Sequence, residues 1–190
     1  MGLKENLIRR GYDFVEFDTK EDAASYLCNA CAGKTVALGG SVTLSEMGLY
    51  EGLQKSSVCF WHWKNDSLAD ARTASVYVTS ANALAETGEI LNIDGNGNRV
   101  SSTIFGHETV YFVVGENKIT SDLPSAWDRA RNIAAPKNAA RLGKNTPCAA
   151  DGVCHDCQSP QCICSVITVH RRKPSSCNAV VILVHESLGY

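Results

Sequence analysis

The stretch Thr35-Val-Ala-Leu-Gly-Gly-Ser-Val-Thr-Leu-Ser-Glu46 joins a short apolar run to a helical pattern through a pair of glycines. The continuous apolar run at 35–38 predicts a strand that is covered on both faces of a sheet. The run Thr43-Leu-Ser-Glu46 has the form of a capping box, which predicts that a helix opens with Thr43 and Glu46 at its cap. A strand that turns through glycine into a helix is the unit from which α/β domains are built.

The alternation of strands and helices continues along the chain. Apolar runs predict strands at 12–17, 58–61, 76–79, 110–114 and 180–184, and helical spacing predicts helices at 3–10, 67–73 and about 123–142. A further helix is expected between a capping box at 19–22 and Gly33. The segments 89–93 and 99–105 flank Asp94-Gly-Asn-Gly-Asn98, whose Asp-Gly and Asn-Gly pairs suit a hairpin turn. We therefore expect an α/β fold, a mainly parallel sheet flanked by helices with an inserted β-hairpin.

Composition excludes several classes of protein. The length of 190 residues, 44% of them hydrophobic, favours one domain over residues 1–190. A net charge of −2 with mixed signs lacks the basic footprint of a nucleic-acid-binding protein. The first residues lack the apolar stretch of a signal peptide, and no segment approaches the roughly 20 apolar residues that span a bilayer. We therefore expect a cytoplasmic protein with no membrane span.

Polar residues follow the predicted strands at 35–38 and 76–79, at the point where α/β sheets bind ligands. Glycines in the turn after the strand at 35–38 would let a phosphate or carboxylate approach backbone N–H groups, although a tight turn without a ligand is the alternative. Glu86 could act as a general base or a carboxylate nucleophile, or be a solvated loop residue. Asp94 and Asn98 are also ordinary turn formers. The expected ligand-binding residues are Gly39, Gly40, Ser41, Ser80, Asn82, Thr87, Gly88, Asp94, Asn98 and Arg99.

The chain has nine cysteines, an odd number, and its first residues show no export signal. Both features argue against a disulfide framework. Five of the cysteines gather in the polar segment 148–164, where packing does not explain them. Thiolates suit zinc or an iron–sulfur cluster, and either would fold a segment too small for its own core. The spacing matches neither a ferredoxin nor a zinc ribbon, and the alternatives are free thiols and a disulfide or redox pair. The five are Cys148, Cys154, Cys157, Cys162 and Cys164.

In their order, several runs resemble the LUD family, the lactate-utilisation proteins typified by lactate utilization protein C. The matching runs include Gly39-Gly-Ser-Val-Thr-Leu-Ser-Glu46, Thr79-Ser-Ala-Asn82, Glu86-Thr-Gly-Glu-Ile90, Asn92-Ile-Asp-Gly95, Gly97-Asn-Arg99, Asn117-Lys-Ile119, Thr146-Pro-Cys148, Cys154-His-Asp-Cys157 and Ile163-Cys164. The resemblance covers about residues 35 to 190. It implies that the four cysteines 148, 154, 157 and 164 are the shared set, whereas Cys162 stands where a basic residue is expected.

This resemblance implies a fold like that of the ribose-phosphate isomerase and CoA-transferase superfamily. It also implies a link to bacterial oxidation of L-lactate to pyruvate beside iron–sulfur oxidoreductase subunits. The leading hypothesis is a ligand-binding or accessory component that takes a small anionic ligand, a phosphate or a carboxylate. The rivals are an independent isomerase or acyl-CoA transferase that uses Glu86, and a metal- or redox-sensing regulator that uses the cysteines. The sequence leaves open whether the chain forms a homo-oligomer.

Overall fold

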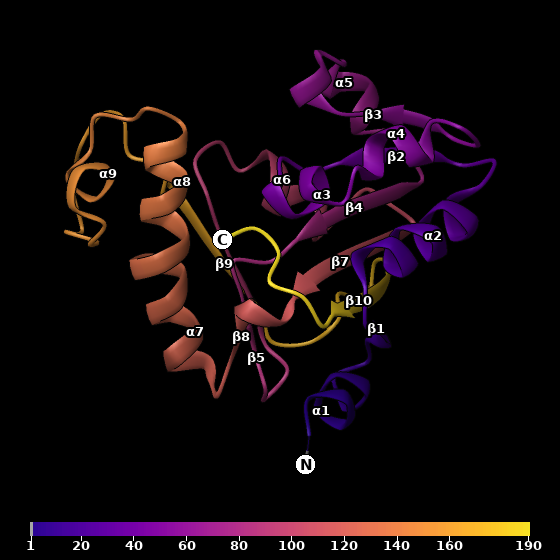
Figure 1. The fold of residues 1–190 in the computed structure, drawn as a ribbon, viewed down its shortest axis with the longest axis horizontal. Coiled ribbons are helices and arrows are strands. Elements are labelled where there is room, and N and C mark those ends of the chain that lie inside the picture. Colours follow the sequence, from indigo (N-terminus) through magenta and orange to yellow (C-terminus); the bar gives the residue numbers. More distant parts are fainter. Residues whose placement is uncertain (1) are drawn as a thin grey trace.

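The computed structural model, which describes residues 2–190, contains a main sheet of six parallel strands (Figure 1). Every neighbouring pair in the order β1-β10-β7-β4-β2-β3 is parallel. This confirms the predicted mainly parallel sheet. The strands are β1 (Asp13–Phe17), β10 (Asn178–Val184), β7 (Thr109–Gly115), β4 (Val76–Ser80), β2 (Thr35–Leu38) and β3 (Val58–Phe60).

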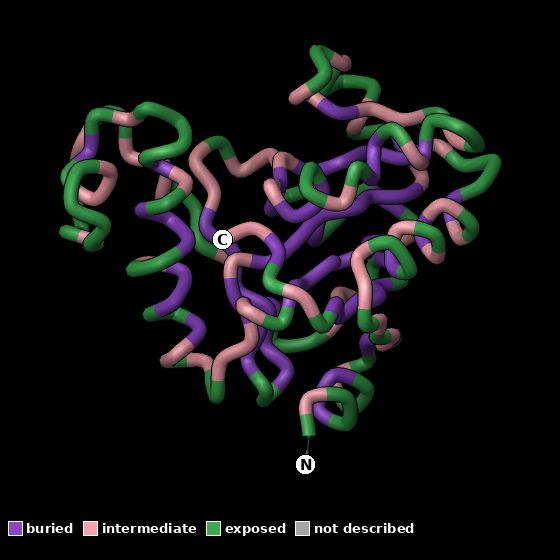
Figure 2. The backbone as a smooth tube through the Cα atoms, viewed as in Figure 1, coloured by how far each residue is buried: buried purple, intermediate pink, exposed green. Residues whose placement is uncertain are grey.

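Both faces of the main sheet are buried, as the colouring of Figure 2 shows for its central strands. In β7, Tyr111 and Val113 pack on one face, and Phe112 and Val114 pack on the other. The first face is covered by α2 (Lys20–Cys31), α3 (Val42–Glu46) and α4 (Leu49–Leu53). The second face packs on α1 (Leu3–Arg9) and on a second, smaller sheet. Burial on both faces explains why these strands are almost continuously apolar.

The second sheet has four strands in the order β8-β5-β6-β9. Its members are β5 (Ala83–Ala85), β6 (Ile90–Asp94), β8 (Ile119–Thr120) and β9 (Val166–His170). Leu84 and Ile90 point towards the main sheet, whereas Leu91 packs against a helical segment on the outer side. That segment runs through α7 (Leu123–Arg129), a π-helical stretch η3 (Ala130–Ala134) and α8 (Ala135–Arg141), in agreement with the helix predicted over 123–142.

The inserted hairpin is present, but its turn lies elsewhere than predicted. Strands β5 and β6 pair antiparallel and are joined by residues 86–89, whereas residues 98–102 form the helix α6 (Asn98–Ser102). The Asp94 carboxylate explains the difference, because it accepts hydrogen bonds from the backbone N–H groups of Asn96, Arg99 and Val100 at 3.1, 2.9 and 3.1 Å. An aspartate that binds these donors favours a turn into a helix over a hairpin.

The predicted capping box at the start of α3 is wrong. The N-cap of α3 is Ser41, whose hydroxyl accepts from the backbone N–H of Leu44 at 3.4 Å. Thr43 instead donates to the carbonyl of Leu188 at 3.2 Å, and Glu46 accepts from the N–H of Gly189 at 2.7 Å. Thr43 and Glu46, which the local pattern assigned to the cap, therefore bind the distant segment at 188–189 instead.

The remaining elements are short. They are η1 (His62–Lys64), α5 (Leu68–Ala71), η2 (Glu116–Lys118) and α9 (Pro147–Asp151). Pro136 lies in the first turn of α8, directly after the π-helical stretch, so the missing N–H of proline is accommodated without ending the helix. None of the helices described for residues 2–190 has both the length and the apolar character that crossing a membrane requires.

Gly39 allows β2 to run close to the side chains of β4. A Cβ atom at this position would lie 2.5 Å from Tyr77 Oη and 2.7 Å from Thr79 Oγ1, and both of those side chains are buried. We expect Gly39→Ala to lower the free energy of unfolding by about 1–3 kcal/mol, the usual cost of overpacking, in urea denaturation. Gly95→Ala is the matched control, because its Cβ would make only ordinary contacts starting at 3.4 Å. Equal stability of the two variants would contradict this account.

Candidate functional site

A polar pocket of about 510 Å³ opens at the carboxyl ends of β2, β4 and β7. The turn after β2 contributes Gly40 and Ser41, the end of β4 contributes Ser80, and the short η2 after β7 contributes Lys118. These three strands are neighbours in the sheet and run in the same direction. Their carboxyl ends therefore meet at one edge, the usual position of a ligand site in an open α/β sheet.

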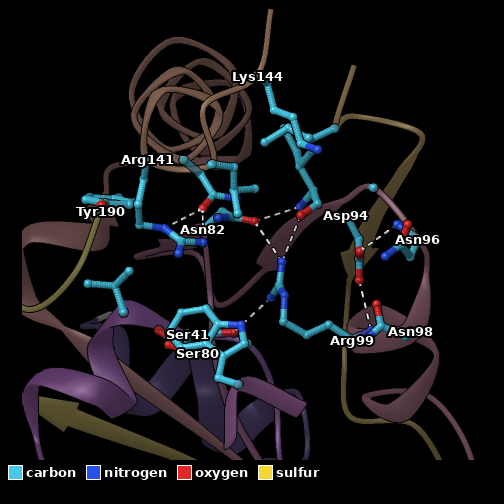
Figure 3. Close-up of a pocket in the computed structure, with 18 of the residues that line it drawn as sticks. Ser41, Ser80, Asn82, Asp94, Asn96, Asn98, Arg99, Arg141, Lys144 and Tyr190 are labelled. Atoms are coloured by element: carbon cyan, nitrogen blue, oxygen red, sulfur yellow. Dashed lines mark hydrogen bonds between the residues drawn. The ribbon is translucent and has the colours of Figure 1, made fainter. Parts of the chain in front are cut away.

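The opposite side of the pocket comes from the second sheet and the long helical segment (Figure 3). Asn82 follows β4, Asp94 and Arg99 flank the turn into α6, and Arg141 ends α8. Figure 3 shows Arg99 near the centre of the site, with Arg141 and Tyr190 on one side and Asp94 on the other. The pocket thus lies between the two sheets and α8.

Positive charge dominates the pocket. Four cationic side chains line it, and Asp94 is the one carboxylate side chain among the described lining residues. That carboxylate already accepts three backbone hydrogen bonds within its own loop. An excess of cations in a cleft attracts an anionic ligand. The four cations are Arg99, Lys118, Arg141 and Lys144.

Uncharged oxygen atoms hold the guanidinium of Arg99 in position. Its Nη1 donates to Asn92 Oδ1 at 2.6 Å, and its Nη2 donates to the Ile93 carbonyl at 2.8 Å and to Asn82 Oδ1 at 3.2 Å. The same Asn82 oxygen accepts from the Ile93 N–H at 2.7 Å. These bonds fix the direction of the side chain without neutralising its charge, which is how a preorganised anion-binding group is built.

Lys118 is buried at the base of the pocket. Its Nζ donates to Thr43 Oγ1 at 2.7 Å and to Ser80 Oγ at 2.9 Å, and the residue is 3% exposed. Burial, followed by the positive charges of Arg129 and Arg99, lowers the pKa of Lys118 to about 7, and Glu46 opposes the shift. The neutral and the protonated amine are therefore both populated near neutral pH.

An aromatic wall closes one side of the pocket. The guanidinium of Arg141 lies 4.8 Å from the ring centroid of Trp63, and its Nε and Nη2 donate to Asn138 Oδ1 at 3.1 and 2.8 Å. Trp63 stacks on Trp61 with ring centroids 5.2 Å apart. Trp61 in turn donates from Nε1 to the carbonyl of Gly39 at 3.2 Å. These contacts form a continuous path from the glycine turn to Arg141, which is exposed at the mouth of the site.

The structure brings most of the predicted ligand-binding residues together. Gly39 is an exception, because it is buried behind the pocket and packs on β4. Of the predicted ligand-binding residues, those that line the pocket are Gly40, Ser41, Ser80, Asn82, Asp94, Asn98 and Arg99.

Glu86, Thr87 and Gly88 do not line this pocket. They form the turn between β5 and β6, where the carbonyl of Glu86 accepts from Asn6 Nδ2 at 2.8 Å and the carbonyl of Thr87 accepts from Arg10 Nε at 2.6 Å. The side chain of Glu86 is exposed to solvent. Strand β5 carries the chain away from the edge of the main sheet before it turns, so closeness in sequence to Asn82 does not become closeness in space.

Several lining residues were not predicted from the sequence. Lys118 follows the central strand β7, in the run Asn117-Lys-Ile119 that also carries the family resemblance. This position after a predicted strand could have identified it as a candidate site residue. The others depend on where η1, α8 and the segment after β10 dock on the sheet, which no local pattern reveals. They are Trp63, Arg141, Lys144 and Tyr190.

The five clustered cysteines surround a second cavity of about 330 Å³ beside the first, and Cys162 lines both. Cys154 Sγ accepts from Arg131 Nη2 at 3.4 Å, and burial together with the neighbouring thiols raises the pKa of Cys164 to about 12. Among residues 2–190, no three histidine, cysteine or acidic side chains are arranged to hold a metal ion. The thiols as positioned therefore do not fit a single-ion site, and the zinc or iron–sulfur centre stays a prediction.

The two cysteines on α2 lie in a different environment. Cys31 is fully buried and Cys28 is half-buried, and both pack in the core between α2 and the main sheet. Burial raises the pKa of the Cys31 thiol to about 11. These two residues therefore pack as small apolar side chains.

Anaerobic purification with elemental analysis and absorption spectroscopy tests the predicted metal centre. The sequence prediction expects iron or zinc in stoichiometric amount, retained in Cys28→Ala and lost in Cys154→Ala and Cys157→Ala, because only the latter two thiols line the second cavity. Wild-type protein that carries neither metal would remove the prediction of a metal centre.

The chain is similar to known proteins both in its sequence and in its fold. The family model described as the LUD domain matches residues 1–184. A DUF162 family protein from Deinococcus radiodurans is similar in structure, with a TM-score of 0.57 and 12% identity over 95% of this chain and 93% of that one. Ribose 5 phosphate isomerase A from Neisseria gonorrhoeae gives a TM-score of 0.40 and 18% identity over 55% and 54% of the two chains. Among curated proteins, none matches the sequence.

Proposed function

The chain belongs to the LUD domain family, and we propose that it binds a small molecule bearing a phosphate or carboxylate group in the pocket at the ends of β2, β4 and β7. One observation carries this proposal. Arg99 and Lys118 point their charged groups at neutral oxygen atoms, and no carboxylate within the described residues pairs with either of them. Cations that are buried or half-buried without a counterion are costly, and an anionic ligand removes that cost.

The cations, rather than the start of a helix, support anion binding in this proposal. Helix α3 has five residues, and the hydroxyl of Ser41 already accepts from the N–H of Leu44 in its first turn. Arg99 and Lys118 lie deeper in the pocket, and the exposed Arg141 lies nearer its mouth. We infer that Arg99 binds the anionic group, that Lys118 lies beside the bound ligand, and that Arg141 adds a charge-assisted contact to the anion from the mouth of the pocket.

The size of the pocket fits a small metabolite. Its volume of about 510 Å³ lies within the usual range for small-molecule sites. Asn82 and Asn98 supply amide groups for hydrogen bonds to a polar ligand, and Trp63 supplies an aromatic surface. The stacking of Arg141 on Trp63 keeps the guanidinium extended along the wall of the pocket.

The sequence resemblance to lactate-utilisation proteins supports a biological role for this binding. We propose that the protein is a ligand-binding or accessory component of L-lactate oxidation to pyruvate, with iron–sulfur oxidoreductase subunits as its partners. L-lactate and pyruvate both carry the carboxylate that the cations would recognise. The rival role as an isomerase or acyl-CoA transferase relied on Glu86, and its exposed position in the β5–β6 turn does not support it.

Tryptophan fluorescence offers a direct test of binding, because Trp63 lines the pocket. We expect titration with inorganic phosphate, L-lactate or pyruvate to change the emission of the wild-type protein. Arg141→Ala should weaken the binding of the same ligand roughly tenfold, equivalent to about 1.4 kcal/mol, because a charge-assisted contact is lost.

Lys55→Ala is the control, since Lys55 is an exposed cation beyond α4 and outside the pocket. Its affinity should match that of the wild type. Wild-type protein that binds none of the three anions would contradict the proposed function, as would equal losses of affinity in Arg141→Ala and Lys55→Ala.

A further inference from the structure

The surroundings of Lys118 favour a reactive amine over a permanent cation. Two of the three donor positions of its ammonium group are already used by Thr43 and Ser80, and the residue is 3% exposed. The ammonium group of a solvated lysine ordinarily serves as a point charge. A buried lysine beside other cations exposes a lone pair on nitrogen, the state that attacks a carbonyl carbon.

The charged groups around Lys118 come from several elements. Arg129 on α7 donates to the carbonyls of Asn117 and Asn82 and is 7% exposed, and Arg99 approaches from α6. Glu46 on α3 is the acidic residue that acts on Lys118 in the opposite direction, but its carboxylate is bound by the N–H of Gly189. Two arginines and burial therefore outweigh one glutamate.

Neutral hydroxyls contact the amine directly. Thr43 Oγ1 accepts from Lys118 Nζ and donates to the carbonyl of Leu188, and Ser80 Oγ lies 3.4 Å from Thr43 Oγ1. The two hydroxyls thus form a connected pair on the nitrogen. Such a pair can take a proton from the amine and return it to a neighbouring oxygen atom.

We propose that Lys118 forms an imine with a small carbonyl compound whose carboxylate or phosphate group is bound by Arg99. In this step the nitrogen lone pair adds to the carbonyl carbon as the C=O π bond breaks, and the two protons of the neutral amine pass in turn to the former carbonyl oxygen through the hydroxyls of Thr43 or Ser80. Water then leaves with the former carbonyl oxygen, and a C=N bond remains, so that no oxidant or reductant is consumed. The inference rests on the proposed function, because the anionic group positions the carbonyl.

Borohydride trapping tests this reaction. The full-length protein is incubated separately with pyruvate, which carries a carboxylate, and with glyceraldehyde 3-phosphate, then reduced, digested and mapped by mass spectrometry. We expect a reduced adduct on Lys118 with at least one of the two compounds, and the arm that labels identifies the anionic group. Lys118→Arg should lose the adduct, because its guanidinium stays protonated, whereas Lys55→Arg should keep it.

The pH profile separates Lys118 from ordinary lysines. The yield of the Lys118 adduct should reach half its maximum near pH 7, whereas exposed lysines should react appreciably only at much higher pH. A profile for Lys118 that follows the exposed lysines would overturn the proposal, and so would adducts confined to other lysines. Since these measurements use the wild-type protein, they hold even if Lys118→Arg fails to fold.

Binding measured by tryptophan fluorescence in the same samples distinguishes this inference from the proposed function. Binding of pyruvate or glyceraldehyde 3-phosphate without an adduct on Lys118 would overturn the imine and leave the anion site intact. Absence of both binding and adduct would overturn the two together.

Discussion

Two hydrogen bonds from Lys118 Nζ, to Thr43 and to Ser80, tie together the segments that leave three neighbouring strands. Lys118 follows β7, Ser80 ends β4, and Thr43 lies in the helix that follows β2. Because these strands are parallel and adjacent, their carboxyl ends must meet, and a long side chain from one can reach the hydroxyls of the other two. The pocket depends on this convergence, since its floor is made of the same three segments.

The convergence carries an energetic cost that the fold does not offset internally. Lys118, Arg129 and Arg99 are close enough for the two arginines to lower the pKa of the lysine, and they are bound by carbonyl, amide or hydroxyl oxygens. A structure selected for stability alone would place a carboxylate among them or an apolar residue at position 118. Local violations of this kind concentrate at functional sites, which is why we assign the anionic ligand to this pocket.

Much of the architecture could be predicted because local signals agreed with tertiary contacts. Apolar runs that are buried on both sides identified the strands of the main sheet, and the polar residues after β2 and β4, among them Ser80 and Asn82, were correctly expected to meet. The misplaced hairpin turn has a local cause, because Asp94 binds backbone N–H groups of its own loop. The other failures depend on contacts or chain directions that are set by distant parts of the sequence. Thr43 and Glu46 bind the segment at Leu188 and Gly189 instead of capping α3. Glu86 lies at the far end of β5, away from the pocket. The burial of Lys118 and its contacts with the hydroxyls of Thr43 and Ser80 arise only when distant segments fold together.

The charge state of Lys118 is the quantity from which the site's proposed chemistry follows, and NMR titration of the lysine side-chain signals measures it directly. The account predicts a pKa of about 7 for Lys118 in the ligand-free protein, far below the ordinary value of 10.5, because burial and two arginines disfavour the charged form. Adding inorganic phosphate should raise that pKa, since a bound anion stabilises the ammonium group. A pKa near 10.5 that phosphate leaves unchanged would contradict the account.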